Sequence, residues 1–102
     1  MDSTQLLKNA KKEIGVTIQG SSYDEAVSKI FIQTREEVYK LLDGRPLINL
    51  KAQEVYFEDV KVDRTTERFL FLFWPREKIH YTIKSKVVIV IDYLDKKEEE
   101  LK

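Results

Sequence analysis

The chain has 102 residues, and its 18 lysines and arginines are balanced by 18 aspartates and glutamates. This length fits one domain with a single hydrophobic core. The absence of cysteine excludes disulfides and thiolate metal sites, and the zero net charge argues against a general polyanion binder.

Hydropathy predicts a chain that does not insert into a membrane. The longest purely aliphatic run, VVIVI at 87–91, is far shorter than the ~20 residues that a spanning helix needs. The N-terminus has no apolar run of the length found in signal peptides. We therefore expect a cytoplasmic protein.

The first predicted strand is EIGVTIQG at 13–20, in which Ile14, Val16 and Ile18 alternate with polar or small residues. A helix follows, because Ser22 and Glu25 have the spacing of a capping box. Gly44 is expected to end this helix near Asp43.

The helix carries an apolar stripe at spacings of three and four, which predicts a core-facing side. Two apolar residues, Ile32 and Tyr39, point away from that stripe and lie seven residues apart, about two turns. They are either isolated surface residues or a second contact surface for another chain. The stripe and its flank comprise Tyr23, Ala26, Val27, Ile30, Phe31, Thr34, Val38, Leu41 and Leu42.

After Pro46 the alternation is typical of strands, but its parity changes. Apolar residues occupy even positions to Ala52, odd positions at Val55 and Phe57, and even positions again from Val60. A shift of one residue turns the apolar face over unless a bulge absorbs it. We therefore expect a break between Ala52 and Val60, followed by a weak turn at Asp63–Arg64.

The segments 65–74 and 79–94 are expected to form a hairpin across residues 75–78. A tight turn predicts one apolar face, with Phe73 opposite Ile79, Phe71 opposite Tyr81 and Phe69 opposite Ile83. It predicts a mixed second face, with Leu72 opposite His80, Leu70 opposite Thr82 and Arg68 opposite Lys84.

These elements predict an α+β fold in the order β-α-β-β-β, with one helix packed on a curled antiparallel sheet. The domain is expected at 13–94, between an N-terminal extension (1–12) and a charged tail (95–102). One helix covers one face of such a sheet, so the other face needs a partner, and we predict a homo-oligomer. The predicted contact residues are Leu70, Leu72, Trp74, Val88 and Val90, with Ile32 and Tyr39 as a second surface. The alternative is a sheet that coils strongly enough to wrap the helix within one chain.

Catalytic, metal and phosphate signatures are absent from the sequence. A lone histidine, His80, without cysteine makes neither a triad nor a metal site. The carboxylates between Glu54 and Glu67 match no calcium loop. The three glycines form no phosphate loop. We expect no cofactor, no metal and no enzymatic activity.

A basic, partly aromatic face offers a weaker hypothesis of anion or ligand binding. Its candidate residues are Arg68, Arg76, His80 and Lys84, beside Trp74. Such a face is also compatible with single-stranded nucleic acid, although ERFLFLFW lacks the spacing of the known RNA-binding signature.

Residues 66–94 carry a pattern of an aromatic-rich strand, Pro75–Arg76, and a Val/Ile-rich strand that ends at Asp92. With GSSYDEAVSKI upstream, this pattern resembles a family of short bacterial proteins of unknown function. The resemblance implies genes beside multi-pass membrane proteins and sugar-acid catabolic enzymes, and hence a membrane-protein partner. By analogy the topology is also similar to that of dodecins, small flavin-binding oligomers.

The leading hypothesis is a non-enzymatic, self-associating cytoplasmic module, accessory to membrane transport or sugar-acid catabolism. The second is an oligomer that binds a small flavin-like or anionic molecule. The third is a nucleic-acid-binding sheet surface.

Overall fold

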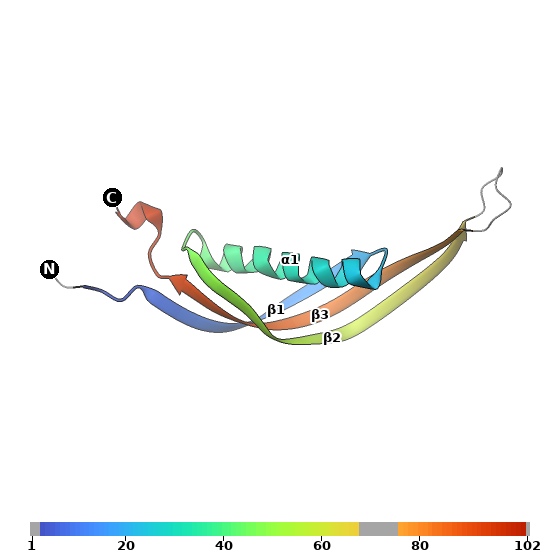
Figure 1. The fold of residues 1–102 in the computed structure, drawn as a ribbon, viewed down its shortest axis with the longest axis horizontal. Coiled ribbons are helices and arrows are strands. Elements are labelled where there is room, and N and C mark those ends of the chain that lie inside the picture. The colour runs from blue at the N-terminus through green and yellow to red at the C-terminus, as the bar shows by residue number, and fades with distance from the viewer. Residues whose placement is uncertain (1–2, 68–75, 102) are drawn as a thin grey trace.

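The computed structural model describes residues 3–67 and 76–101. They form the strand β1 (Leu7–Gly20), the helix α1 (Tyr23–Leu42), the strands β2 (Leu47–Glu67) and β3 (Arg76–Leu94), and the short 3-10 helix η1 (Glu98–Leu101). The helix lies along one face of a curved sheet (Figure 1). The predicted α+β fold, with one helix on an antiparallel sheet, is confirmed.

Within the described residues the sheet has three strands in the order β1-β3-β2, and β3 pairs antiparallel with both neighbours. Two described strands follow the helix rather than the expected three, because β2 continues through Asp63 and Arg64 instead of turning there. Most of the predicted strand at 65–74 lies outside the described residues. Neither residue is Gly or Pro, so nothing in the local sequence interrupts the extended backbone.

The predicted parity break is confirmed. β2 shifts register against β3 between Ala52 and Glu54 and again between Phe57 and Asp59. Each shift inserts one extra residue, so Ala52, Val55, Phe57 and Val60 all stay on the side of the sheet that faces the helix. We call this side the helix face and the opposite side the open face.

The predicted hairpin register is wrong. Tyr81 pairs with Val62 and Ile83 pairs with Val60, rather than with Phe71 and Phe69. On the open face, His80 lies opposite Asp63, Thr82 opposite Lys61, and Lys84 opposite Asp59. The tight-turn register assumed a new strand after a turn at Asp63–Arg64. Because β2 continues without that turn, its residues 60–64 lie opposite residues 79–83 of β3, where the segment 65–74 was expected.

The first strand begins at Leu7, ahead of the expected start at Glu13. Residues 7–12 are mostly polar because this edge strand meets solvent, yet their backbone pairs with β3 from Ile89 to Leu94. The hydrophobic signal therefore marks only the half of β1 that lies under the helix.

Both ends of α1 are capped where the sequence predicts. The Ser22 hydroxyl accepts a hydrogen bond from the Glu25 backbone N–H at 3.1 Å. The Glu25 carboxylate accepts from the Ser21 backbone N–H and hydroxyl, so the reciprocal half of the capping box is displaced by one residue. At the other end, Asp43 and Gly44 both take positive φ, at 48° and 90°.

The core lies between α1 and the β1–β3 half of the sheet. The buried helix residues follow a strict spacing of four, which is a narrower stripe than the sequence predicts, and Tyr23, Phe31 and Leu41 are exposed. On the sheet, Ile14, Val16 and Ile18 are buried as expected. The other core residues are Ala26, Ile30, Val38, Leu42, Ile83, Val87, Ile89 and Ile91.

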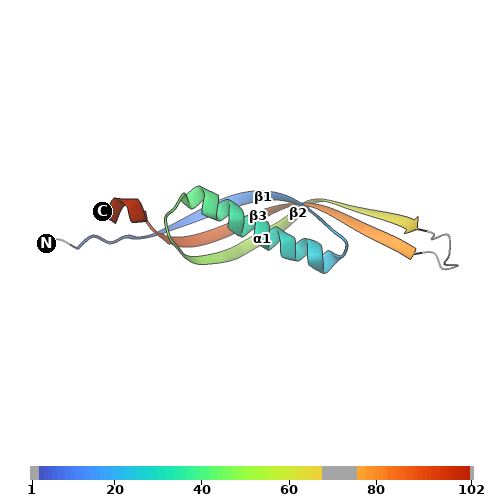
Figure 2. The same ribbon diagram turned by 90° about the horizontal axis from the view of Figure 1, so that it is seen from above.

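The molecule is long and thin, measuring 77 × 27 × 14 Å. β1 reaches only as far as Tyr81 on β3, so residues 63–67 and 76–80 pair with each other alone. This two-stranded segment, which we call the arm, projects past the start of the helix (Figure 2).

Candidate functional site

The helix leaves part of its own side of the sheet uncovered. α1 packs chiefly on β1 and β3 and makes few contacts with β2. Four apolar residues on the helix face of β2 are therefore 40–46% exposed. We call them the β2 strip: Val55, Phe57, Val60 and Val62.

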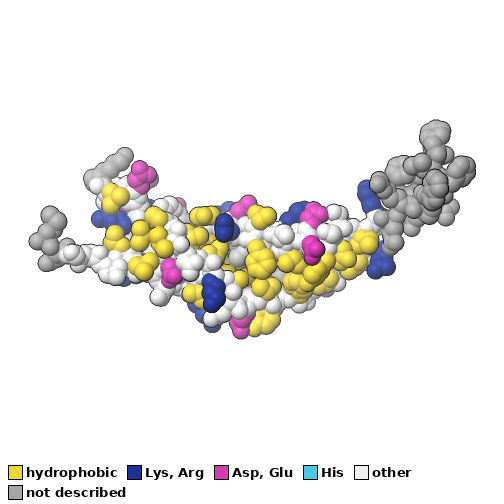
Figure 3. Space-filling view, in the orientation of Figure 1, with side chains coloured by type: hydrophobic (Ala, Val, Ile, Leu, Met, Phe, Trp, Pro, Cys, Tyr) yellow, Lys and Arg dark blue, Asp and Glu magenta, His cyan; other side chains and the backbone are white. Residues whose placement is uncertain are grey.

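A groove of about 390 Å³ runs between the helix and this strip. The rings of Tyr23 and Phe57 meet across it edge to face, with their centroids 6.4 Å apart. Hydrophobic side chains gather along β2 and below the start of α1 (Figure 3). The groove is lined by Tyr23, Val27, Ile30, Phe31, Val55 and Phe57.

β2 is also an edge strand, so one row of its backbone N–H and C=O groups has no neighbouring strand among the described residues. From Asp59 to Glu67 it pairs with β3 without a register shift. A regular edge of this kind, without a bulge, is a template for a further strand. The apolar strip and the open edge are thus properties of one strand.

The open face of the sheet is polar around its centre. The Lys86 ammonium lies 4.0 Å from a Glu13 carboxylate oxygen across the β1–β3 pair. A hydrogen bond to the Glu54 carboxylate, and the negative charge of that group, raise the pKa of the Tyr56 phenol. Glu13 and Glu54 flank Val88 from both sides. This charged belt surrounds the apolar residues of β3 on the open face.

The predicted open-face contact surface is only partly within the described residues. Val88 is 4% exposed and Val90 is half-buried, both beneath side chains of the neighbouring strands. Leu70, Leu72 and Trp74 lie outside the part of the chain that the structure describes. The role of the five residues as a contact surface stays a prediction.

The structure brings Ile32 and Tyr39 to the same shallow hollow on the outer side of α1. Both are more than half exposed, as their spacing predicts. The hollow also contains Phe31 and Arg35. Phe31 lines this hollow and the groove alike, so the two apolar surfaces are continuous around the helix.

Of the predicted anion-contact residues, His80 and Lys84 are both exposed. Each has an aspartate opposite it on β2, Asp63 and Asp59 respectively. Arg68 and the side chain of Arg76 lie outside the described part. The aspartates lower the positive potential that an anion would meet along this stretch of the open face.

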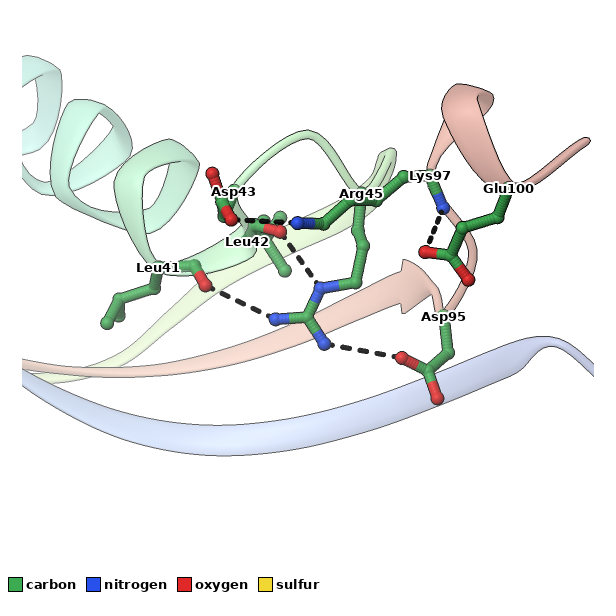
Figure 4. A network of polar contacts seen from close by, with 7 residues as sticks. All are labelled: Leu41, Leu42, Asp43, Arg45, Asp95, Lys97 and Glu100. Carbon is green, nitrogen blue, oxygen red and sulfur yellow. Dashed lines mark hydrogen bonds and ion pairs between the residues drawn. The ribbon is translucent and has the colours of Figure 1, made fainter.

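A polar network ties the end of α1 to the C-terminal segment (Figure 4). The Arg45 guanidinium donates to the Leu42 carbonyl at 2.9 Å and pairs with the Asp95 carboxylate at 3.3 Å. The Lys97 ammonium lies 2.8 Å from the Asp43 carboxylate, and this hydrogen bond lowers the pKa of that carboxyl. These contacts hold the helix terminus, and we assign them a structural role.

The described ranges, 3–67 and 76–101, contain no group of three or more His, Asp or Glu side chains placed to hold a metal ion. No helix within 3–67 or 76–101 is long and apolar enough to cross a membrane. The α1–β2 groove offers a single hydroxyl, that of Tyr23, among apolar side chains. Its chemistry is that of apolar contact.

Sequence reasoning used the residues of the β2 strip only to predict a break in the strand, and so missed the groove. The signal was present, because four apolar residues share one face once the two bulges are counted. What the pattern does not encode is the lateral position of the helix, which lies over β1 and β3 rather than over the middle of the sheet.

A family model described as a domain of unknown function (DUF4312) matches residues 10–94. The match spans β1 from Ala10, the helix, β2 and all of β3, and thus every element that forms the groove. No curated protein and no solved structure matched the chain.

Proposed function

Since the chain belongs to the DUF4312 family, whose description assigns no activity, we propose its function from the geometry: it is a non-enzymatic module that self-associates through the β2 strip and the α1–β2 groove. The observation that carries this proposal is the exposure of the β2 strip beside an open strand edge. A second copy of the chain supplies both an apolar surface and a strand edge of matching kind.

The size of the apolar surface supports association. The rings of Tyr23, Phe31 and Phe57, between 40% and 53% exposed, leave on the order of 250 Å² in contact with water. The largest apolar patch on a typical monomer covers ~300–600 Å², and the valines of the strip bring this surface into that range. Covering the rings alone at about 25 cal/mol per Å² stabilises a complex by about 6 kcal/mol per copy. Two copies together offset an association cost of ~4–15 kcal/mol.

The direct test is the molar mass in solution, measured by light scattering at several concentrations. We expect a multiple of the 12.1 kDa chain. The variant Phe57→Lys places a charge in the groove and is expected to weaken association about 30-fold or more, as at other buried aromatic anchors.

The neighbouring residue provides the matched control. Tyr56 is an aromatic residue on the same strand, 50% exposed, on the opposite face of the sheet. Tyr56→Lys is expected to leave association within about threefold of wild type, in line with the small effect of most surface changes. A wild-type monomer at all concentrations, or equal loss in both variants, would refute the assignment of the surface.

The cellular setting implied by the family resemblance completes the proposal. We place the module in the cytoplasm of a bacterial cell, as an accessory to membrane transport or sugar-acid catabolic components. Affinity capture from a native membrane extract, with this chain as the bait, tests this setting. Partners that need the assembled form are expected to be lost with Phe57→Lys, and partners that do not need it are expected to remain.

The second candidate is binding of a flat, flavin-like small molecule, favoured by the aromatic lining of the groove. Its volume of about 390 Å³ lies in the range of ligand pockets, ~300–1,000 Å³. Flavin mononucleotide is the probe, and quenching of its own fluorescence on titration with the protein is the readout. Saturable quenching that Tyr23→Ala abolishes would favour this function. Quenching that stays linear with added protein would exclude it.

A further inference from the structure

We infer that two copies join by pairing their β2 strands antiparallel, with Val62 on the twofold axis and Lys61 of each copy opposite Asp63 of the other. The inference rests on the proposed self-association and specifies its geometry. It follows from the charges on the two edges of the sheet and from the part of the β2 edge that pairs without a bulge.

The two edges of the sheet differ in charge pattern. β1 carries Lys8, Lys11 and Lys12 within five residues, a run of like charge that disfavours pairing with a copy of itself. In β2, residues 59–63 read DVKVD, where the charged residues alternate in sign on the open face and the valines lie on the helix face. The β2 edge is therefore the one suited to a second copy.

The regular stretch of the edge limits the pairing to few registers. The last bulge lies between Phe57 and Asp59, so Asp59–Glu67 is the part of β2 that pairs without interruption. A twofold axis normal to the sheet keeps both helices on one side. It also requires paired residues to share a face.

Charge selects among these registers. An axis at Lys61 or at Asp63 sets that residue against its own copy, which is unfavourable. An axis at Val62 instead sets Lys61 against Asp63 twice, on the open face, with Val62 against Val62 on the helix face. An axis at Val60 also pairs opposite charges, but it leaves only residues 59–61 before the bulge.

The same register explains how the groove becomes covered. With the axis at Val62, the strand of the second copy runs back along β2, and its arm comes alongside Phe57. The arm is a two-stranded ribbon whose helix-face residue Ile79 is half-buried in the single chain. Isolated ribbons of two strands are marginal in water. In this register residues 63–67 of each arm lie beside residues 57–61 of the other copy, so each arm becomes part of a continuous sheet.

Single-cysteine variants test the register directly, because the chain has no cysteine of its own. Facing residues on antiparallel strands have Cα atoms about 4.5–5.5 Å apart, within the range of a disulfide. We expect Val62→Cys to form a covalent dimer under mild oxidation. Thr65→Cys is the control, because the two copies of position 65 would lie about 20 Å apart.

A charge exchange tests the same pairing without covalent chemistry. Lys61→Asp and Asp63→Lys each set like charges together, and each is expected to weaken the dimer about tenfold or more. The double variant restores opposite charges and is expected to return the dissociation constant to within about threefold of wild type. Circular dichroism confirms that each variant is folded.

The outcomes separate this register from self-association in general. A wild-type dimer that crosslinks at position 65 but not 62, or a double variant as weak as the single ones, overturns the register and leaves self-association intact. A wild-type monomer overturns both.

Discussion

The end of β1 lies in close contact with the start of α1. Because of this contact, we expect a Gly-to-Ala substitution to have different effects on stability at Gly20 and at Gly15. A Cβ atom added at Gly20 would lie 3.0 Å from the Ala26 backbone nitrogen and 3.1 Å from its Cα atom. Ala26 is fully buried, so the helix can move away only by opening the core. At Gly15, no atom lies within 4 Å of the added methyl group.

The two variants are therefore expected to change stability in opposite directions. Carbon atoms pack best at about 3.5–4.0 Å, so Gly20→Ala forces a shift of roughly half an ångström against backbone atoms. Overpacking of this kind lowers the free energy of unfolding by about 1–3 kcal/mol. Neither glycine has a positive φ. Gly15→Ala thus restricts the unfolded chain without strain and raises stability by about 0.4–1 kcal/mol.

Urea unfolding followed by circular dichroism measures both values. All samples need the same protein concentration, since association contributes to apparent stability. In a thermal scan, each kcal/mol corresponds to about 4–8 °C for a domain of this size. Equal midpoints for the two variants, or a Gly20→Ala variant more stable than wild type, would show that the helix does not approach β1 as closely as described.

Two further predictions concern the helix. Ile30→Ala is expected to lower the free energy of unfolding by about 2–5 kcal/mol, because Ile30 is 0% exposed. Ile32→Ala, at a position 61% exposed, is expected to change it by less than about 0.5 kcal/mol in dilute solution. Similar losses for the two variants in denaturant titrations would contradict the burial pattern. Hydrogen bonds from Ser21, and the hydrogen bond and charge of Lys29, lower the pKa of Glu25 from 4.5 to about 2. Its stabilisation is therefore complete above pH 4.5 and is lost as the pH falls towards 2. Glu25→Gln should thus differ from wild type at neutral pH and converge with it near pH 2, and a difference that stays constant with pH would contradict this.

The features that the sequence predicted correctly are local ones. Ser22 and Glu25 mark the helix start through side-chain groups three residues apart, and Gly44 marks its end through a backbone conformation. The parity change between Ala52 and Val60 predicted the bulges, because face alternation is a property of consecutive residues. Such signals depend on residues close together in the sequence and not on tertiary packing.

The features that were missed depend on contacts between distant segments. The register of β2 on β3 is set by pairing over the whole length of both strands, and no turn residue at Asp63–Arg64 fixes it. Residues 7–12 are stabilised by backbone pairing with β3, which leaves no hydrophobic pattern. The β2 strip is exposed because α1 lies over β1 and β3. The position of the helix depends on its packing against all the strands together, so no local pattern encodes it.

The elongated shape of the chain affects measurements of its molar mass. Its radius of gyration is 20.2 Å, whereas a compact domain of this length has about 13 Å. An elongated particle diffuses slowly and emerges early from a sizing column, as a heavier sphere would. A single chain could therefore be taken for a dimer on elution volume alone, and frictional ratios from sedimentation velocity are needed to separate shape from mass.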